Sequence, residues 1–138
     1  MKKMTKVLTL LLFVASLTAM TSCKKVDKNL IIGSWKCSSA TLTTLGVPMD
    51  YPLAEGMNWT FQSDGKLIAD LVPELDIEDI TNYVINGNEL RVSWVELDGD
   101  LETEFFTIKE LTNSKLTLAE FEDELDDDYL TLNFVRLQ

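Results

Sequence analysis

The feature that most constrains the fold is a succession of short alternating segments separated by residues that favour tight turns. Within them, apolar side chains occupy every second position, as in Met57, Trp59 and Phe61, which is the period of a strand with one buried face. Asn86-Gly87-Asn88 is the strongest turn signal, because these residues adopt the positive φ angles of two-residue hairpins. Eight strands are predicted in this way: 34–45, 57–62, 66–71, 81–85, 89–97, 101–111, 115–121 and 129–137.

Eight successive antiparallel strands joined by short turns leave two exposed edges, and closure of the sheet on itself removes both. We therefore predict an all-β fold, an eight-stranded antiparallel up-and-down β-barrel, with a helical turn at residues 30–32. The only other helix expected is a short one within residues 73–80.

The alternation also predicts which side chains point into the barrel. On the first strand it places Ser39 and Thr41 on the face of Trp35. In the segment 101–111 it is ambiguous, because Phe105 and Phe106 are adjacent and must face opposite sides. The residues expected inside are Trp35, Cys37, Trp59, Phe61, Leu67, Ala69, Tyr83, Ile85, Leu90, Val92, Trp94, Leu116, Leu118, Leu130, Leu132 and Phe134.

The N-terminal end of the chain has the layout of a secretory signal. Three lysines in the first six residues precede an apolar run at residues 7–20, which at about 14 residues is shorter than the ~20 that span a bilayer. Thr21-Ser22 then stand directly before Cys23. This stretch resembles the lipobox of bacterial lipoproteins, which implies cleavage before Cys23 and lipidation of its thiol. The alternative is an ordinary signal peptide in which Cys23 has no role.

These boundaries predict a lipoprotein signal peptide at residues 1–22, a lipidated Cys23 with its tether at residues 23–29, and a barrel domain at residues 30–138. Two or three acyl chains anchor a protein stably to a bilayer. The bilayer is therefore an expected partner and the cell envelope the expected location. The outer membrane is the default, and the side of the membrane on which the domain lies stays open.

The composition excludes several classes of function. The chain has 23 acidic and 12 basic residues, and its net charge of −11 argues against nucleic acid as a partner. It has no histidine, which excludes His-based zinc sites and catalytic triads. We expect no enzymatic activity and no cofactor, because the acidic residues are expected in loops or outward positions and no inward nucleophile lies beside a base. With Cys23 lipidated, Cys37 has no disulfide partner and is expected to be buried.

The first and last predicted strands carry a family resemblance. Ile32-Gly33-Ser34-Trp35 places a Gly-x-Trp motif at the first strand, and Arg136 lies near the end of the last. Together with the stretch 59–65, these residues resemble the small lipocalin-like domains of bacterial lipoproteins. The resemblance implies that Gly33, Trp35 and Arg136 close one end of the barrel, with the guanidinium stacked on the indole.

In an up-and-down barrel, alternate connections lie at the same end. The longer ones, at residues 46–56 and 72–80, define what we call the mouth, where the acidic residues gather; the basic residues map to the other end, the closed end. An acidic mouth is predicted to attract a cationic small molecule, Ca²⁺ or a basic protein. The alternative is that the charge serves only solubility and orientation on the membrane. No dedicated metal site is predicted, but one loop offers oxygen ligands for a weak Ca²⁺ site: Asp123, Asp126, Asp127 and Asp128.

Two function classes follow. The first is a monomeric barrel that binds a small apolar or cationic ligand at its mouth. The second is an interaction or inhibitor lipoprotein with a filled barrel, which binds a basic protein. The apolar, proline-braced segment 47–53 serves as a lid or contact surface in one case and as a plug in the other. The ligand-contact residues expected for the first class are Met49, Tyr51, Trp59, Phe61, Tyr83 and Trp94.

Overall fold

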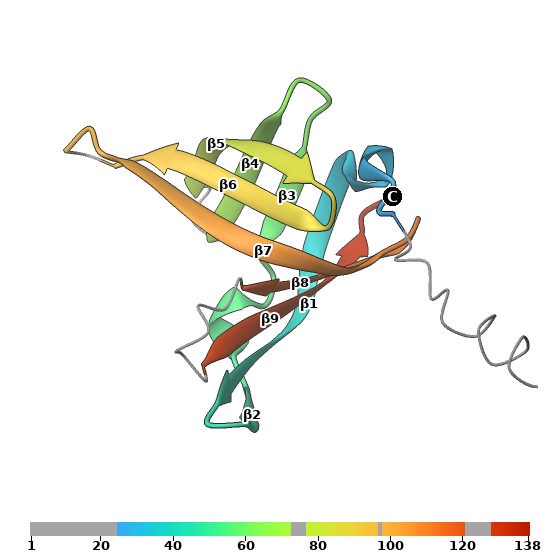
Figure 1. Cartoon of the computed structure of the whole chain (residues 1–138), viewed down its shortest axis with the longest axis vertical. Coiled ribbons are helices and arrows are strands. Elements are labelled where there is room, and N and C mark those ends of the chain that lie inside the picture. The colour runs from blue at the N-terminus through green and yellow to red at the C-terminus, as the bar shows by residue number, and fades with distance from the viewer. Residues whose placement is uncertain (1–24, 73–76, 97, 121–127) are drawn as a thin grey trace, which may run out of the picture.

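The computed structural model describes residues 25–72, 77–96, 98–120 and 128–138, and most of them belong to strands of one sheet (Figure 1). No helix in this part of the chain is long and apolar enough to cross a membrane. In chain order the elements are the 3₁₀ turn η1 (Lys28–Ile31), β1 (Gly33–Thr44), β2 (Val47–Asp50), the 3₁₀ turn η2 (Pro52–Ala54), β3 (Asn58–Phe61), β4 (Lys66–Val72), β5 (Ile77–Asn86), β6 (Glu89–Val95), β7 (Leu101–Leu111), β8 (Lys115–Glu120) and β9 (Tyr129–Arg136).

The sheet closes through its first strand. β1 pairs with β3 over Gly33–Lys36 and with β9 from Trp35 to Thr43, while from β3 to β9 each strand pairs with the next one in the chain. All pairings are antiparallel, so β1 and β3 to β9 form the predicted eight-stranded closed barrel. β2 pairs only with the outer half of β1 and extends from the barrel as a flange (Figure 1).

The structure corrects the prediction for two connections. Val47–Asp50 forms a strand where a loop was expected, because β1 continues beyond its pairing with β3 and leaves a free edge at Thr41–Thr44. The helix predicted within residues 73–80 is wrong where the structure describes it: from Ile77 onward the chain is in β5, paired with β4. Residues 73–76 lie outside the described part of the chain.

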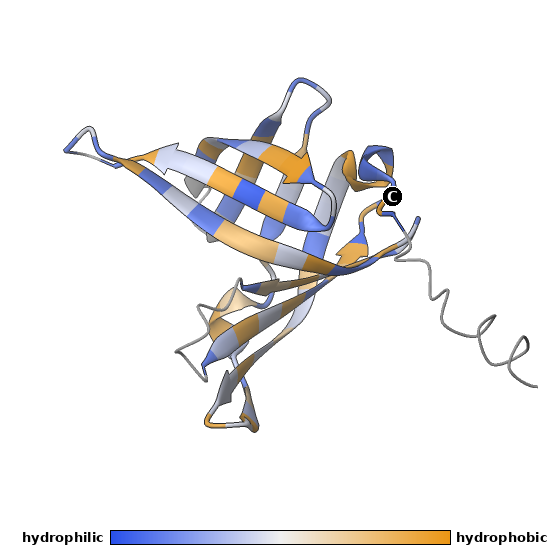
Figure 2. Cartoon of the chain, viewed as in Figure 1, coloured by the Kyte–Doolittle hydropathy of each residue, from blue (hydrophilic) through white to orange (hydrophobic). Residues whose placement is uncertain are grey.

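The core contains the expected inward residues. Of the sixteen residues expected inside, twelve are buried, and Tyr83, Ile85, Trp94 and Leu130 are partly buried against them. Phe106 points inward with 4% of its surface exposed, and Phe105 outward with 38%. The alternation of apolar and polar residues along the strands is visible in Figure 2. Alternation therefore predicted the core correctly.

A bulge interrupts this alternation on β1. The register with β9 shifts between Cys37 and Ser39, so that Ala40 becomes the next buried residue. Ser39 and Thr41 therefore do not share the face of Trp35, contrary to the expectation from strict alternation. Ser39 instead accepts a hydrogen bond from the side-chain amide of Asn133 at 3.2 Å.

The closed end is sealed by Arg136 and Trp35. The Arg136 guanidinium lies 4.2 Å from the centroid of the Trp35 ring, which is completely buried. Its Nε donates to Asn113 O (2.7 Å), its Nη1 to Ile32 O (2.9 Å) and its Nη2 to Leu30 O. The Trp35 Nε1 donates to Ile31 O at 2.7 Å, which ties η1 to the same end.

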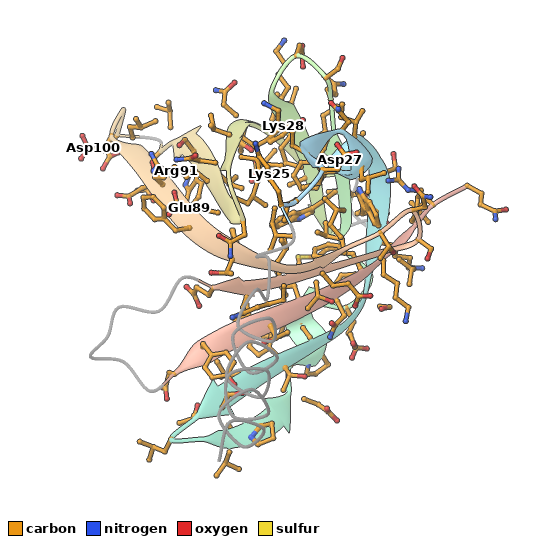
Figure 3. All side chains as sticks on the ribbon, turned by 45° about the vertical axis from the view of Figure 1, so that its right-hand side comes forward. Lys25, Asp27, Lys28, Glu89, Arg91 and Asp100 are labelled. Atoms are coloured by element: carbon orange, nitrogen blue, oxygen red, sulfur yellow. The ribbon has the colours of Figure 1, made fainter. Side chains whose placement is uncertain are left out.

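Gly33 gives the arginine room. Its φ angle is +129°, and a Cβ added at Gly33 would lie 2.5 Å from Arg136 Nη1. Only glycine satisfies both conditions without displacement. The N-terminal segment of the described chain joins the barrel at this end. Its residues Lys25 and Lys28 are labelled in Figure 3.

Candidate functional site

A cleft opens in the barrel wall where β5 and β6 diverge. The two strands pair only from Asn82–Ser93 to Asn86–Glu89, so the Ile77–Thr81 segment of β5 has no β6 partner. The resulting space has a volume of about 680 Å³ and lies at the mouth. Its lining includes Asp79, Ile80, Thr81, Trp94, Glu96, Asp98 and Leu101.

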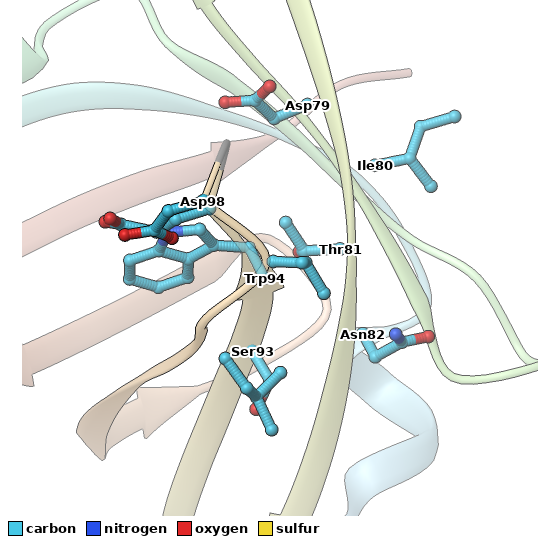
Figure 4. A pocket seen from close by; sticks show the side chains of 10 residues that line it. Asp79, Ile80, Thr81, Asn82, Ser93, Trp94 and Asp98 are labelled. Carbon is cyan, nitrogen blue, oxygen red and sulfur yellow. The ribbon is translucent and has the colours of Figure 1, made fainter.

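Acidic and aromatic groups face the same side of this cleft. Figure 4 shows Asp79, Asp98 and the Trp94 indole on one side of β5, with Ile80 on the other. Ile80 is 68% exposed and belongs to the outer surface. The cleft thus joins the outside of the barrel to the inner side of its mouth.

Four carboxylates share the inward face of the wall that runs from β5 to β8. Residues that are direct partners on neighbouring antiparallel strands lie on the same face of the sheet. Each of these four acids is the partner of a residue that belongs to the core or packs against it. The pairs are Asp79 with Ala69, Glu102 with Trp94, Glu104 with Val92, and Glu120 with Phe106.

Glu104 has the most perturbed electrostatic environment of this wall. Although its side chain keeps access to solvent, surrounding protein atoms desolvate the carboxyl group and raise its pKa above the ordinary value. The negative charge of Glu120 raises the pKa further. Ionising Glu104 therefore costs free energy in the folded protein, and a cation bound between the two carboxylates would offset that cost.

The opposite wall, formed by β1 and β9, is apolar. Leu42 pairs with Leu130 and Ala40 with Leu132, so each pair shares a face. Ala40 and Leu132 are buried, and Leu130 packs against the core. The mouth therefore has one acidic wall and one apolar wall, which we call by these names below.

Below the mouth, aromatic side chains fill the barrel. The Trp59 ring centroid lies 5.2 Å from that of Phe134 and 5.9 Å from that of Phe106, and Phe61 lies 5.0 Å from Tyr83. The Trp59 Nε1 is buried and has no acceptor among the described residues. The interior space available to a ligand is therefore at the mouth.

The structure separates the six side chains that the sequence suggested as ligand contacts. Trp59 and Phe61 belong to the core, and the Tyr83 hydroxyl donates to Gln62 O at 2.7 Å near the closed end. Trp94 alone lines the cleft. Met49 is 48% exposed on the β2 flange, and Tyr51, at the end of that flange, packs partly against the core.

The acidic wall was not predicted from the sequence, because the acidic residues were expected in loops or on the outside of the barrel. The missing information was which of Phe105 and Phe106 points inward. Once Phe106 does, Glu104 and Glu102 follow at the alternate positions of β7. A choice between the two phenylalanines would have identified these carboxylates.

The other suggested sites are mostly outside the described residues. Cys23, Asp123, Asp126 and Asp127 lie there. Asp128 is described, and its Oδ1 accepts a hydrogen bond from Leu45 N at 3.3 Å. In the described ranges, no group of three or more potential metal-ligating side chains is present.

No protein-family model matches this sequence, and no curated protein matches it. Solved structures do resemble the fold. A lipocalin-like protein from Bacteroides uniformis ATCC 8492 has a TM-score of 0.53 and 17% identity, over 78% of this chain and 99% of that one. An uncharacterized protein from Bacteroides eggerthii DSM 20697 has a TM-score of 0.50 and 15% identity, over 77% and 98%.

A third solved structure, a complex of LTBP1 with LTC4, has a TM-score of 0.56 and 13% identity, over 85% of this chain and 72% of that one. At such low identities the likeness concerns the fold alone. The barrel is lipocalin-like, as the Gly-x-Trp motif and Arg136 implied.

Proposed function

We propose that this protein is a lipid-anchored envelope protein whose lipocalin-like barrel binds an organic cation with an apolar body at its mouth. The observation that carries the proposal is the pairing of an acidic wall with an apolar wall around one opening. An ammonium group would lie against Glu102, Glu104 and Glu120, and its apolar body against Leu42 and Leu130.

The electrostatics of the site favour a cation over a neutral ligand. Glu104 and Glu120 repel each other, and a positive charge between them would remove that repulsion. Trp94 shares the inward face with Glu102, so its ring is available for a cation–π contact. The LTBP1–LTC4 complex supports small-molecule binding as a use of this fold.

The position of the N-terminal tether supports the anchoring part of the proposal. Lys25, the first described residue, lies beside Thr112 and Asn113 in the turn between β7 and β8, at the closed end. An anchor at Cys23 would therefore attach the barrel by its closed end and leave the mouth free.

Isothermal titration calorimetry of the chain from Lys24 tests the ligand class. The probes are hexylamine and 2-phenylethylamine, each compared with the alcohol and the carboxylate of the same carbon skeleton. We expect the amines to bind at least tenfold more tightly than the alcohols, because only the amines interact with the carboxylates.

Two variants locate the binding site. Glu102→Gln combined with Glu104→Gln should weaken amine binding by a factor on the order of ten or more, since two carboxylates facing the ligand are neutralised. Glu110→Gln, an exposed change near the closed end, should leave binding unchanged. Equal affinities for amine and alcohol would contradict the cation site. No binding of either amine would contradict the proposal and favour the filled barrel with a basic protein partner.

A further inference from the structure

The basic residues of the described chain all lie at the closed end. They belong to the N-terminal tether and η1, to the start of β1, to the strand segments that flank the three short turns, and to the end of β9. They are Lys25, Lys28, Lys36, Lys66, Arg91, Lys109, Lys115 and Arg136. The closed end also carries four described acidic residues, Asp27, Asp64, Glu89 and Glu110, but the other described carboxylates lie toward the mouth. The molecule is therefore polarised along the barrel axis.

Not all of these cations are available to a partner. Arg91 Nε lies 2.5 Å from a Glu89 carboxylate oxygen, and Lys66 Nζ lies 3.9 Å from one of Asp64. Arg136 is turned onto Trp35. The remaining cations are exposed and form no ion pair with any described residue: Lys25, Lys28, Lys36, Lys109 and Lys115.

Apolar side chains are exposed among these free lysines. Val135 is the strand partner of Lys36 on one side and of Lys115 on the other, so the three share the outer face of the sheet. Val135 and Leu137 are each 41% exposed, and Ile32 is 38% exposed. Lysines interleaved with small apolar groups are typical of surfaces that contact lipid headgroups.

A groove at the same end adds a concave element. It has a volume of about 1060 Å³ and lies between the tether, the Gly87-Asn88 turn and the Thr112-Asn113 turn. Its lining includes Lys25, Lys109, Val26 and Ile108, and also Asp27 and Glu110, so the excess of positive charge lies on the surface around the groove and not in it. Figure 3 shows Lys25 and Lys28 close together at the N-terminal end of the described chain.

We propose that the closed end docks on an anionic phospholipid bilayer, with the acidic mouth directed away from it. The whole chain has a net charge of −11, so a surface of average composition would be repelled by such a bilayer. Attraction therefore depends on the closed end facing the membrane, where its free lysines lie within a Debye length of the lipid charges. This contact holds the barrel in one orientation, independently of the cation site.

Vesicle flotation tests the proposal without the acyl anchor. The chain from Lys24 contains every described element, and the barrel closes within Gly33–Arg136. We expect it to bind vesicles of phosphatidylcholine with 40% phosphatidylglycerol. It should not bind phosphatidylcholine alone, and 0.5 M NaCl should release it.

Two variants with the same net charge separate the closed end from the mouth. Lys109→Gln with Lys115→Gln removes two positive charges at the closed end. Each lysine near the membrane contributes a factor of about five in affinity for the vesicles, so the double variant should bind about thirtyfold more weakly. Val47→Glu with Leu53→Glu adds two negative charges at exposed positions on the mouth side, and should change binding less than threefold.

Equal losses in the two variants would show a dependence on net charge alone and would overturn the docking surface. Binding that does not depend on anionic lipid would overturn it as well.

Discussion

Replacing Arg136 with methionine tests how the closed end is held together. Methionine keeps an unbranched apolar side chain of similar length above Trp35 but removes the charge and every donor. The structure assigns the arginine three backbone acceptors and one aromatic ring. These contacts differ in their exposure to solvent, so they contribute different amounts to the free energy of unfolding.

The magnitude follows from those environments. The bonds to Ile32 O and Asn113 O are solvent-exposed, so water replaces them at little cost. The bond to Leu30 O is partly buried and charge-assisted, which corresponds to about 1.5–3 kcal/mol. The cation–π contact on the fully buried Trp35 adds about 1–2 kcal/mol. We therefore expect the free energy of unfolding to fall by about 2.5–5 kcal/mol.

Urea denaturation followed by tryptophan fluorescence measures this change. With a slope of about 1.3 kcal/mol/M for a domain of this size, the midpoint should fall by about 2–4 M. Arg91→Met is the matched control, because its guanidinium is exposed, lies 5.5 Å from the Phe105 centroid and pairs with Glu89 at the surface. It should cost about 1 kcal/mol or less. Equal losses for the two variants, or a loss of less than about 1 kcal/mol for Arg136→Met, would show that these contacts do not hold the closed end together.

Three other changes test neighbouring parts of the account. Gly33→Ala should lower the free energy of unfolding by about 2 kcal/mol or more. The loss should be smaller when Arg136→Met is also present, because the arginine nitrogen that the new Cβ meets is then absent. Urea denaturation of the single and double variants measures the two losses. Glu104→Gln should stabilise the fold at pH 7, because the raised pKa of Glu104 means that the ionised carboxylate is penalised in the folded state. The gain in stability over the wild type should disappear well below pH 4.5, where the wild-type carboxyl is protonated in both the folded and the unfolded state. Thermal unfolding at several pH values measures both effects. Cys37, whose pKa is raised by burial and whose surface is 1% exposed, should react with an aromatic disulfide reagent at least about a thousandfold more slowly in the native protein than in urea; comparable rates would contradict its burial.

Most of the fold was predictable because it depends on local alternation. A strand with one buried face repeats every two residues, and the turn residues mark its ends, so the inward set could be read directly from the sequence. β2 could not be predicted in this way. Val47-Pro48-Met49-Asp50 has apolar residues at two alternate positions, but it contains a proline and all four residues are exposed. It is a strand because β1 extends beyond β3 and offers it an edge.

The candidate site was less predictable, since it depends on register and pairing. The bulge after Cys37 changes the face of β1 without a glycine or proline to mark it. The cleft exists because β5 and β6 stop pairing at Asn82–Ser93, although both continue toward the mouth. The acidic wall required the orientation of Phe106. Each of these features is set by how one strand pairs with its neighbours in the sheet, which the alternation within a single strand does not specify.

The most direct test of the cation site is native mass spectrometry of the protein produced from its full chain and purified from its own host's envelope without denaturation. We expect a co-purifying small molecule that carries a positive charge at neutral pH and an apolar body. The same molecule should be absent from the variant with Glu102→Gln and Glu104→Gln and present in Glu110→Gln. A clean unliganded mass that persists after incubation with envelope extract, or a bound molecule that is neutral or acidic, would contradict the account.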